Sequence, residues 1–103
     1  MELKRVVVTG LGALTPLGNT VSDYWNNLIK GVSGAGPITR FDASKFKTQF
    51  ACEVRDFDPL TILDRKEARK LDLFSQFGLA AAIQAVEDSG ITTASNFNPD
   101  RVG

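Results

Sequence analysis

The chain carries the stretch Arg-Val-Val-Val-Thr-Gly-Leu-Gly at residues 5–12, followed at residues 14–19 by Leu-Thr-Pro-Leu-Gly-Asn. Three consecutive β-branched apolar residues are typical of a strand that is covered on both faces, as inside a parallel sheet. The glycines directly after them mark a tight bend, where the backbone needs a positive φ angle or approaches another segment closely. We therefore predict a strand from Leu3 to Thr9 in an α/β fold.

A buried parallel strand needs neighbouring strands and covering helices, and a chain of 103 residues has little room for them. We therefore expect residues 1–103 to form one incomplete part of a single α/β domain. The missing layers are expected to come from polypeptide that follows Gly103.

Composition limits the class of protein. Apolar residues make up 43 % and charged residues 23 % of the chain, which is ordinary for a soluble globular protein. Twelve basic residues balance twelve acidic ones, so no overall charge draws the chain to nucleic acid or to an acidic membrane surface. The single cysteine excludes an internal disulfide, and no signal-peptide pattern begins the chain. We expect a cytoplasmic protein.

The chain contains no histidine, which removes the commonest general base and the commonest metal ligand. With one cysteine and no histidine, zinc sites of the usual kinds are excluded. We interpret Cys52 as a small buried apolar side chain, because no histidine is available to activate its thiol.

The glycines at positions 10 and 12 invite comparison with the dinucleotide fingerprint. That motif needs a third glycine three residues after the second, and this chain has Thr15 there. No acidic residue ends a second strand about 20 residues later, as the motif also requires. We therefore expect no nucleotide cofactor; a nucleotide-dependent reductase stays as an alternative that a cofactor titration tests.

Apolar periodicity and a capping residue predict the first helix. Thr20 is a candidate N-cap, and Asp23 stands where a capping box has its acid. The helix is expected to run from Val21 to Lys30, with Gly31 as the left-handed residue that ends it. The apolar residues on one face of this helix are Val21, Tyr24, Trp25, Leu28 and Ile29.

The region after this helix is predicted as an irregular connection over residues 31–50, held by the packing of its phenylalanines. A short strand is expected from Gln49 to Val54. The phenylalanines concerned are Phe41, Phe46 and Phe50.

The second half of the chain has a helical pattern. We predict one helix over residues 60–71 and a longer one that Asp72 caps, that runs to about Asp88 and that Gly90 closes. Small residues form a stripe on the longer helix, so another backbone is expected to approach it closely. Gly78 is expected to relieve a steric clash, since glycine costs about 1 kcal/mol inside a helix. The stripe consists of Gly78, Ala81, Ala82 and Ala85.

The strongest charge cluster is Arg-Lys-Glu-Ala-Arg-Lys at residues 65–70, with four cations and one anion. On a helix, Lys66 lies one turn from Lys70, and Arg65 lies one turn from Arg69, so the cations form a broad basic face. Two interpretations are open at this point. The face is either a solvated helix surface or a docking patch for an acidic partner or a phosphate group.

Several blocks of the sequence together resemble the amino-terminal end of the β-ketoacyl-acyl-carrier-protein synthases, and synthase II of bacterial fatty acid synthesis among them. The blocks are residues 5–19, 40–42, 50–51 and 65–72, and the resemblance extends from Lys4 to Gly103. It implies a thiolase-like αβαβα architecture of five layers and a homodimer. The implied activity is that of an acyltransferase that condenses malonyl carrier protein with an enzyme-bound acyl thioester.

The resemblance also assigns roles to residues. The catalytic cysteine and the two histidines of the family belong to parts of its sequence beyond Gly103, so no catalytic residue is expected in this chain, and Cys52 is not the nucleophile. Lys66, Arg69 and Lys70 match family positions that contact the acidic helix of acyl carrier protein. A non-catalytic partner subunit of a ketosynthase pair is the alternative that shares the fold.

Overall fold

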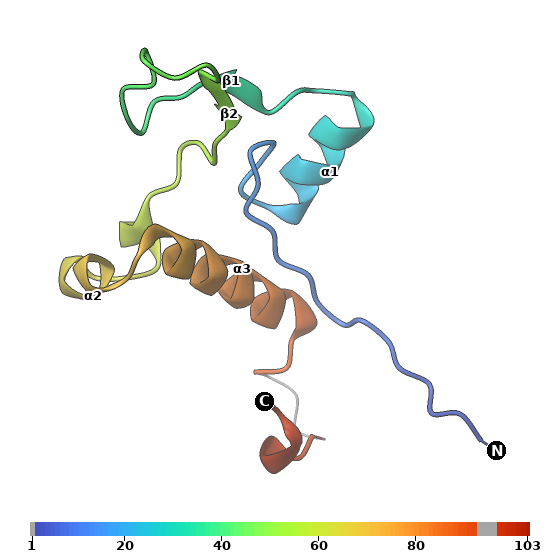
Figure 1. Ribbon diagram of the computed structural model, residues 1–103. Coiled ribbons are helices and arrows are strands. Elements are labelled where there is room, and N and C mark those ends of the chain that lie inside the picture. The colour runs from blue at the N-terminus through green and yellow to red at the C-terminus, as the bar shows by residue number, and fades with distance from the viewer. Residues whose placement is uncertain (1, 93–96) are drawn as a thin grey trace.

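The computed structural model describes residues 2–92 and 97–103 (Figure 1). The longest helix, α3, is joined to the short α2 at one end, and α1 and a small β-hairpin lie on one side of it (Figure 1). The elements in chain order are α1 (Val21–Ile29), β1 (Ala35–Pro37), β2 (Phe50–Cys52), η1 (Pro59–Thr61), α2 (Arg65–Lys70), α3 (Leu73–Ser89) and η2 (Pro99–Arg101).

Helix α1 confirms the first helical prediction and ends one residue earlier than expected. The hydroxyl of Thr20 accepts a hydrogen bond from the backbone N–H of Asp23 at 3.1 Å, as an N-cap residue does. Gly31 follows the helix with a φ angle of 72°, the left-handed conformation that glycine adopts without strain.

Helix α3 confirms the third helical prediction almost to the residue. It begins directly after Asp72, and Gly90, whose φ angle of 69° is left-handed, caps its carboxyl end. Asp72 makes no side-chain cap hydrogen bond, so the closing glycine is the better-defined of the two ends.

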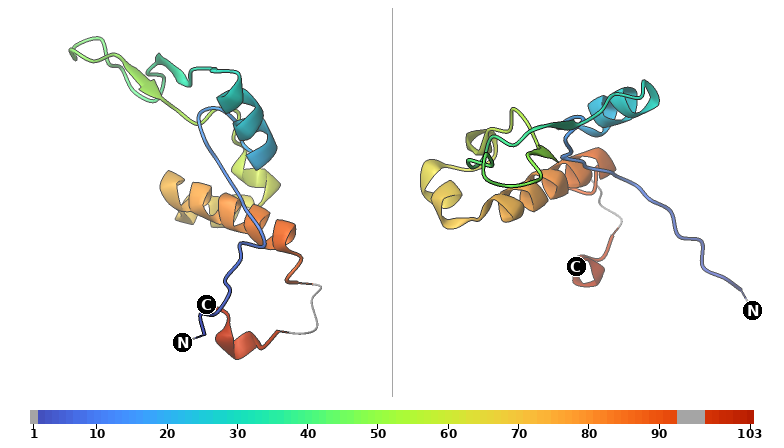
Figure 2. Two further views of the ribbon diagram at one scale, coloured as in Figure 1. Left: turned by 90° about the vertical axis from the view of Figure 1, so that its right-hand side faces the viewer. Right: turned by 45° about the horizontal axis from the view of Figure 1, so that its top comes forward.

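The small-residue stripe of α3 is approached closely by another backbone, as predicted. A Cβ atom built on Gly12 would overlap the carbonyl of Ala81, and one built on Gly10 would overlap the carbonyl of Ala85. The backbone N–H of Ala13 also donates to the Gln84 side chain at 3.1 Å. Figure 2 shows this amino-terminal segment crossing α3. The glycines of the opening stretch are therefore required by packing against a helix.

The predicted role of Gly78 is wrong in this structure. No atom lies within 4 Å of a Cβ built on it, and the residue is exposed on the surface of α3. The close contacts are made one and two turns further along, by Ala81 and Ala85.

The predicted strand from Leu3 to Thr9 does not form. These residues are extended but unpaired, and Val6, Val7 and Val8 are 88 %, 61 % and 78 % exposed. The segment points away from the rest of the chain (Figure 1). Among the described residues the one sheet is the two-stranded β1–β2 pair, so the segment has no strand beside it to complete a ladder.

The hairpin pairs β1 with β2 in antiparallel register, with Gly36 opposite Ala51. Strand β2 confirms the predicted short strand with narrower bounds, whereas β1 falls in the region expected to be irregular. In the loop between the strands, the hydroxyl of Thr39 donates to Glu53 at 2.7 Å. That hydrogen bond, together with one from the Thr39 backbone N–H, holds the pKa of Glu53 below its usual range.

Two predictions for this region need correction. Cys52 is exposed, not buried, because the alternation along β2 turns Ala51 inward and its neighbours outward. Of the three phenylalanines, Phe41 and Phe46 contact each other edge to face at 5.9 Å but stay 56 % and 60 % exposed. Phe50 is 65 % exposed. The rings therefore pair locally without forming a core.

The helix expected over residues 60–71 is two shorter elements. A single 3₁₀ turn, η1, is followed by α2, which begins at Arg65. The carboxylate of Asp64 accepts a hydrogen bond from the backbone N–H of Glu67 at 2.7 Å, so Asp64 acts as an N-cap and starts a new helix there.

Few side chains are buried. Among residues 2–92 and 97–103, only Ala43, Ala80 and Gln76 are buried, at 7 %, 5 % and 8 % exposure. The Cα radius of gyration is 17.8 Å, whereas a compact domain of this length has about 13 Å. The described residues therefore form an open arrangement of elements with little core of its own.

Within the described part, no helix has the length and apolar character needed to cross a membrane.

Candidate functional site

The candidate site is the exposed face of α2. All five charged residues of this six-residue helix are exposed, and Ala68 is half-buried. Arg69 and Lys70 lie in the last turn, where the negative end of the helix dipole favours cations. We call Lys66, Arg69 and Lys70 the α2 basic patch.

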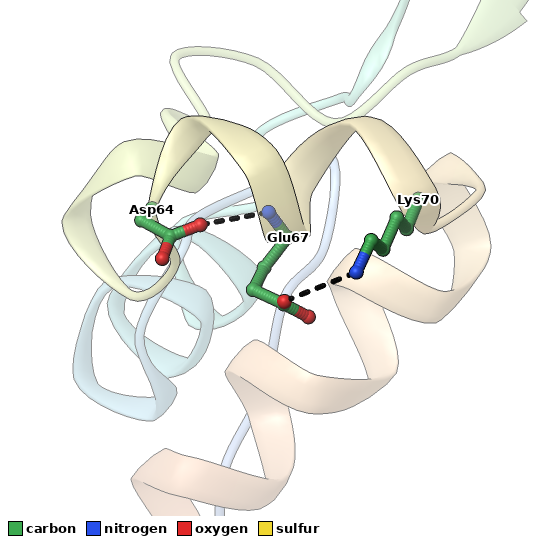
Figure 3. Close-up of polar contacts among 3 residues, drawn as sticks. All are labelled: Asp64, Glu67 and Lys70. Atoms are coloured by element: carbon green, nitrogen blue, oxygen red, sulfur yellow. Dashed lines mark hydrogen bonds and ion pairs between the residues drawn. The ribbon is translucent and has the colours of Figure 1, made fainter.

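A helix of six residues is too short to be stable alone in water, so its ends need partners. At the amino end, the Asp64 carboxylate accepts the hydrogen bond from the backbone N–H of Glu67 (Figure 3). The Glu67 carboxylate in turn lies 3.5 Å from the ammonium of Lys70, one turn further along. The cap and the ion pair thus bracket the helix from its first turn to its last residue.

Gln76 of α3 holds the carboxyl end of α2. Its side-chain amide donates hydrogen bonds to the carbonyl of Ala68 at 2.9 Å and to that of Leu71 at 3.2 Å. A helix end leaves such carbonyls short of partners, and the Ala68 carbonyl otherwise accepts only a long bond of 3.4 Å from the backbone N–H of Leu71. Because Gln76 is only 8 % exposed and Ala68 and Leu71 are half-buried, the bonds are partly shielded from water, and they link the end of α2 to α3.

The role of Gln76 was missed by the sequence analysis. The sequence does contain a signal for it, because Leu79, Ala80 and Ile83 follow Gln76 at helical spacing and place it on an apolar face. A polar residue on a buried helical face is expected to have a hydrogen-bond partner.

The three cations of the α2 basic patch are not equivalent. Lys70 is paired with Glu67, and their side chains are 61 % and 53 % exposed. Within the part of the chain that the structure describes, this is the one ion pair that α2 contains, so Lys66 and Arg69 present their charge to solvent.

A second candidate is a polar hollow of about 380 Å³ around the turn from Thr15 to Gly18. Its prominent cation, Arg55, already donates to the carbonyls of Pro16 at 3.2 Å and Gly34 at 3.0 Å. The amide of Asn27 donates to the carbonyl of Leu17 at 2.6 Å. These side chains bind the turn to α1 and to the hairpin, and none is a nucleophile next to a base. We therefore treat the hollow as structural.

The structure also shows where the Gly-Leu-Gly sequence at residues 10–12 lies. Both glycines lie against the backbone of α3, and no helix begins directly after them, since α1 starts at Val21. The geometry of a dinucleotide site, with phosphates at a helix amino end, is not formed by these residues. In the described ranges, no group of His, Cys, Asp and Glu side chains could hold a metal ion.

The comparison with known families agrees with this geometry. The family model described as the N-terminal domain of beta-ketoacyl synthase matches residues 3–103. The chain therefore belongs to the β-ketoacyl synthase family, in its N-terminal domain, and the resemblance found in the sequence is confirmed.

Curated relatives carry a more specific name. The chain is 58 % identical over 103 residues to "3-oxoacyl-[acyl-carrier-protein] synthase 2" of Coxiella burnetii. It is 52 % identical over 103 residues to the protein of the same name from Synechocystis. These matches include the whole of this chain but only 25 % and 24 % of the two relatives. The chain thus spans about a quarter of the length of the curated relatives it matches.

A solved structure of a related protein has a similar fold. It is described as "The ishigamide ketosynthase/chain length factor" and matches with a TM-score of 0.75 at 37 % sequence identity. The match covers 94 % of this chain and 23 % of that one. The helices and strands described above are therefore arranged as in a ketosynthase.

Proposed function

We propose that this chain is the amino-terminal portion of a β-ketoacyl-acyl-carrier-protein synthase of the synthase II type, and that the α2 basic patch docks acyl carrier protein. The complete enzyme transfers an acyl chain to an active-site thiol. It then releases carbon dioxide from a malonyl thioester, and the resulting carbanion attacks the enzyme-bound acyl thioester, which frees the thiol. The names of the curated relatives and the family match support this assignment.

In this proposal the chain contributes binding and structure, while the thiol and the groups that stabilise the oxyanion come from the remainder of the enzyme. The described residues hold one cysteine, Cys52, in a short exposed strand. No histidine occurs in the chain to activate it. The reaction therefore depends on this segment for the arrival of substrate rather than for bond making.

The single observation that carries the docking role is the charge of α2. The chain has a formal net charge of zero, so any attraction to an acidic partner has to be local. The α2 basic patch places three exposed cations on a helix that is bound at both ends. A fixed cluster of cations steers an acidic protein surface and sets its orientation more than it adds raw affinity.

The fold proposal is a five-layer thiolase-like domain that acts in the cytoplasm as a homodimer. Its support in this chain is the exposed run from Val6 to Val8, which has the composition of a strand buried on both faces. In the complete enzyme we expect this run to pair with strands from the remainder of the polypeptide. The valine side chains are then buried.

Charge reversal in the complete synthase tests the docking role. We expect Lys66→Glu with Lys70→Glu to weaken the binding of acyl carrier protein about tenfold at low ionic strength, and to flatten its salt dependence. The matched control is Lys45→Glu with Lys47→Glu. It changes the net charge equally, but in the exposed loop between β1 and β2 instead of on α2. If the two double variants bind the carrier equally well, the docking role is wrong.

A further inference from the structure

The anion inside the cationic helix is the feature that the docking proposal leaves unexplained. Glu67 is the one acid among the six residues of α2, and its carboxylate lies 3.5 Å from Lys70. Resting on the proposed docking function, we propose that Glu67 is an internal competitor for the carrier protein: a carboxylate of the partner has to displace Glu67 from Lys70 before that cation contributes to binding.

The geometry keeps the competitor in place. The backbone N–H of Glu67 is held by Asp64 at 2.7 Å, and Gln76 holds the carboxyl end of the helix next to Lys70. The spacing between Glu67 and Lys70 is therefore that of a helix bound at both ends. The two charged groups therefore separate only when the side chain of Glu67 or of Lys70 changes its rotamer.

The pair is nevertheless open to exchange. The side chains of Lys70 and Glu67 are 61 % and 53 % exposed, so water and a partner carboxylate both reach them. An exposed pair of this kind is weak. Lys70 can therefore change partners when a carrier protein arrives, and its gain is smaller than that of a free cation by the amount that the pair with Glu67 contributes.

Two consequences follow for recognition. Lys66 and Arg69, which have no ion-pair partner among the described residues of α2, carry most of the attraction. Lys70 adds affinity only for a partner whose carboxylate lies close enough to replace Glu67. Glu67 thus lowers the affinity of α2 for every acidic partner. The loss is smallest for a partner whose carboxylate can replace Glu67, so Glu67 increases the difference in affinity between that partner and other acidic proteins.

The test is the variant Glu67→Gln in the complete synthase, measured with holo-acyl carrier protein at low ionic strength. Glutamine has a helix propensity close to that of glutamate, so α2 is retained. We expect binding to become about two- to fivefold tighter, because Lys70 is released from its internal partner.

The matched control is Asp72→Asn. Asp72 is an exposed acid that follows α2 and makes no side-chain cap hydrogen bond, and asparagine is an equally good N-cap. The control removes the same charge without touching Lys70. We expect less than half of the gain that Glu67→Gln produces; an equal gain overturns the inference, because bulk charge then explains both.

A double-mutant cycle with Lys70→Met completes the test. If Glu67 acts through Lys70, the gain from Glu67→Gln disappears when Lys70 is already methionine. A gain that persists without Lys70 overturns the inference. Failure of the docking proposal itself looks different, since there the reversal of Lys66 and Lys70 leaves carrier binding at the level of its control.

Discussion

The segment from Leu3 to Thr9 and helix α2 are both short and both exposed, yet only one of them is a regular element. The segment is rich in valine and has no strand beside it in the described chain. Helix α2 is rich in charge and has a partner at each end, Asp64 before it and Gln76 on α3. The difference shows what a short element of this chain needs in order to form.

A helix satisfies its interior hydrogen bonds by itself, so capping side chains have only the backbone groups at its ends to bond. A strand satisfies none of its own, and only a neighbouring strand completes it. The valines of the segment therefore indicate a strand that depends on other polypeptide, whereas the capping residues of α2 indicate an element that forms here. The predictions below test this contrast.

The largest effect is expected for Val7→Asp in the complete synthase. If the segment is an interior strand there, a carboxylate without a partner becomes buried, and the free energy of unfolding falls by about 3–5 kcal/mol. Urea denaturation measures the change. The control Val7→Thr keeps the β-branched shape and should cost clearly less. A Val7→Asp enzyme as stable as the wild type would mean that the segment stays in water, as in Figure 1.

A smaller effect is expected for Gly12→Ala. A Cβ atom at this position overlaps the carbonyl of Ala81, so the segment has to move away from α3, at a cost of about 2 kcal/mol. The same substitution at Gly78 meets no atom within 4 Å and should stabilise the helix by about 0.5–1 kcal/mol. Thermal melting of the two variants should therefore shift in opposite directions; shifts of one sign contradict the close contact.

The smallest loss of stability is expected for Gln76→Leu, about 1 kcal/mol, because Ala68 and Leu71 are only half-buried and the Ala68 carbonyl keeps its hydrogen bond from the backbone N–H of Leu71. The effect of Gln76→Leu on the opening of α2 itself is larger. Amide hydrogen exchange in α2 should become faster, since the helix loses its partner at the carboxyl end. The same change at Gln84, whose side chain bonds Ala13 and Asn19 instead, should leave exchange in α2 unchanged.

Features with a local cause could be predicted from the sequence. Thr20 and Gly31 bracket α1, and Gly90 closes α3, because caps act within a few residues. The alanines of α3 also predicted a close backbone neighbour, although they did not say which segment it is.

Other features depend on distant contacts and could not be predicted. Strand β1 has the sequence Ala-Gly-Pro, which carries no strand signal, and it forms only because Phe50–Cys52 lies opposite. The exposure of Cys52 follows from that same pairing. For the candidate site, the cations of α2 were predicted. The ion pair of Glu67 with Lys70 depends on the side-chain rotamers, and the bonds of Gln76 depend on how α3 lies against α2, so neither could be predicted.

The contact between the amino-terminal glycines and α3 also has a consequence during synthesis. The hydrogen bond from Ala13 to Gln84 joins residues 71 positions apart, and ribosomes add about 5–20 residues per second. The nascent amino end therefore waits roughly 4–14 s before its helix has been made. The valines at positions 6–8 stay exposed even after that contact has formed, so once outside the ribosome they are a target for chaperones that capture extended apolar chains.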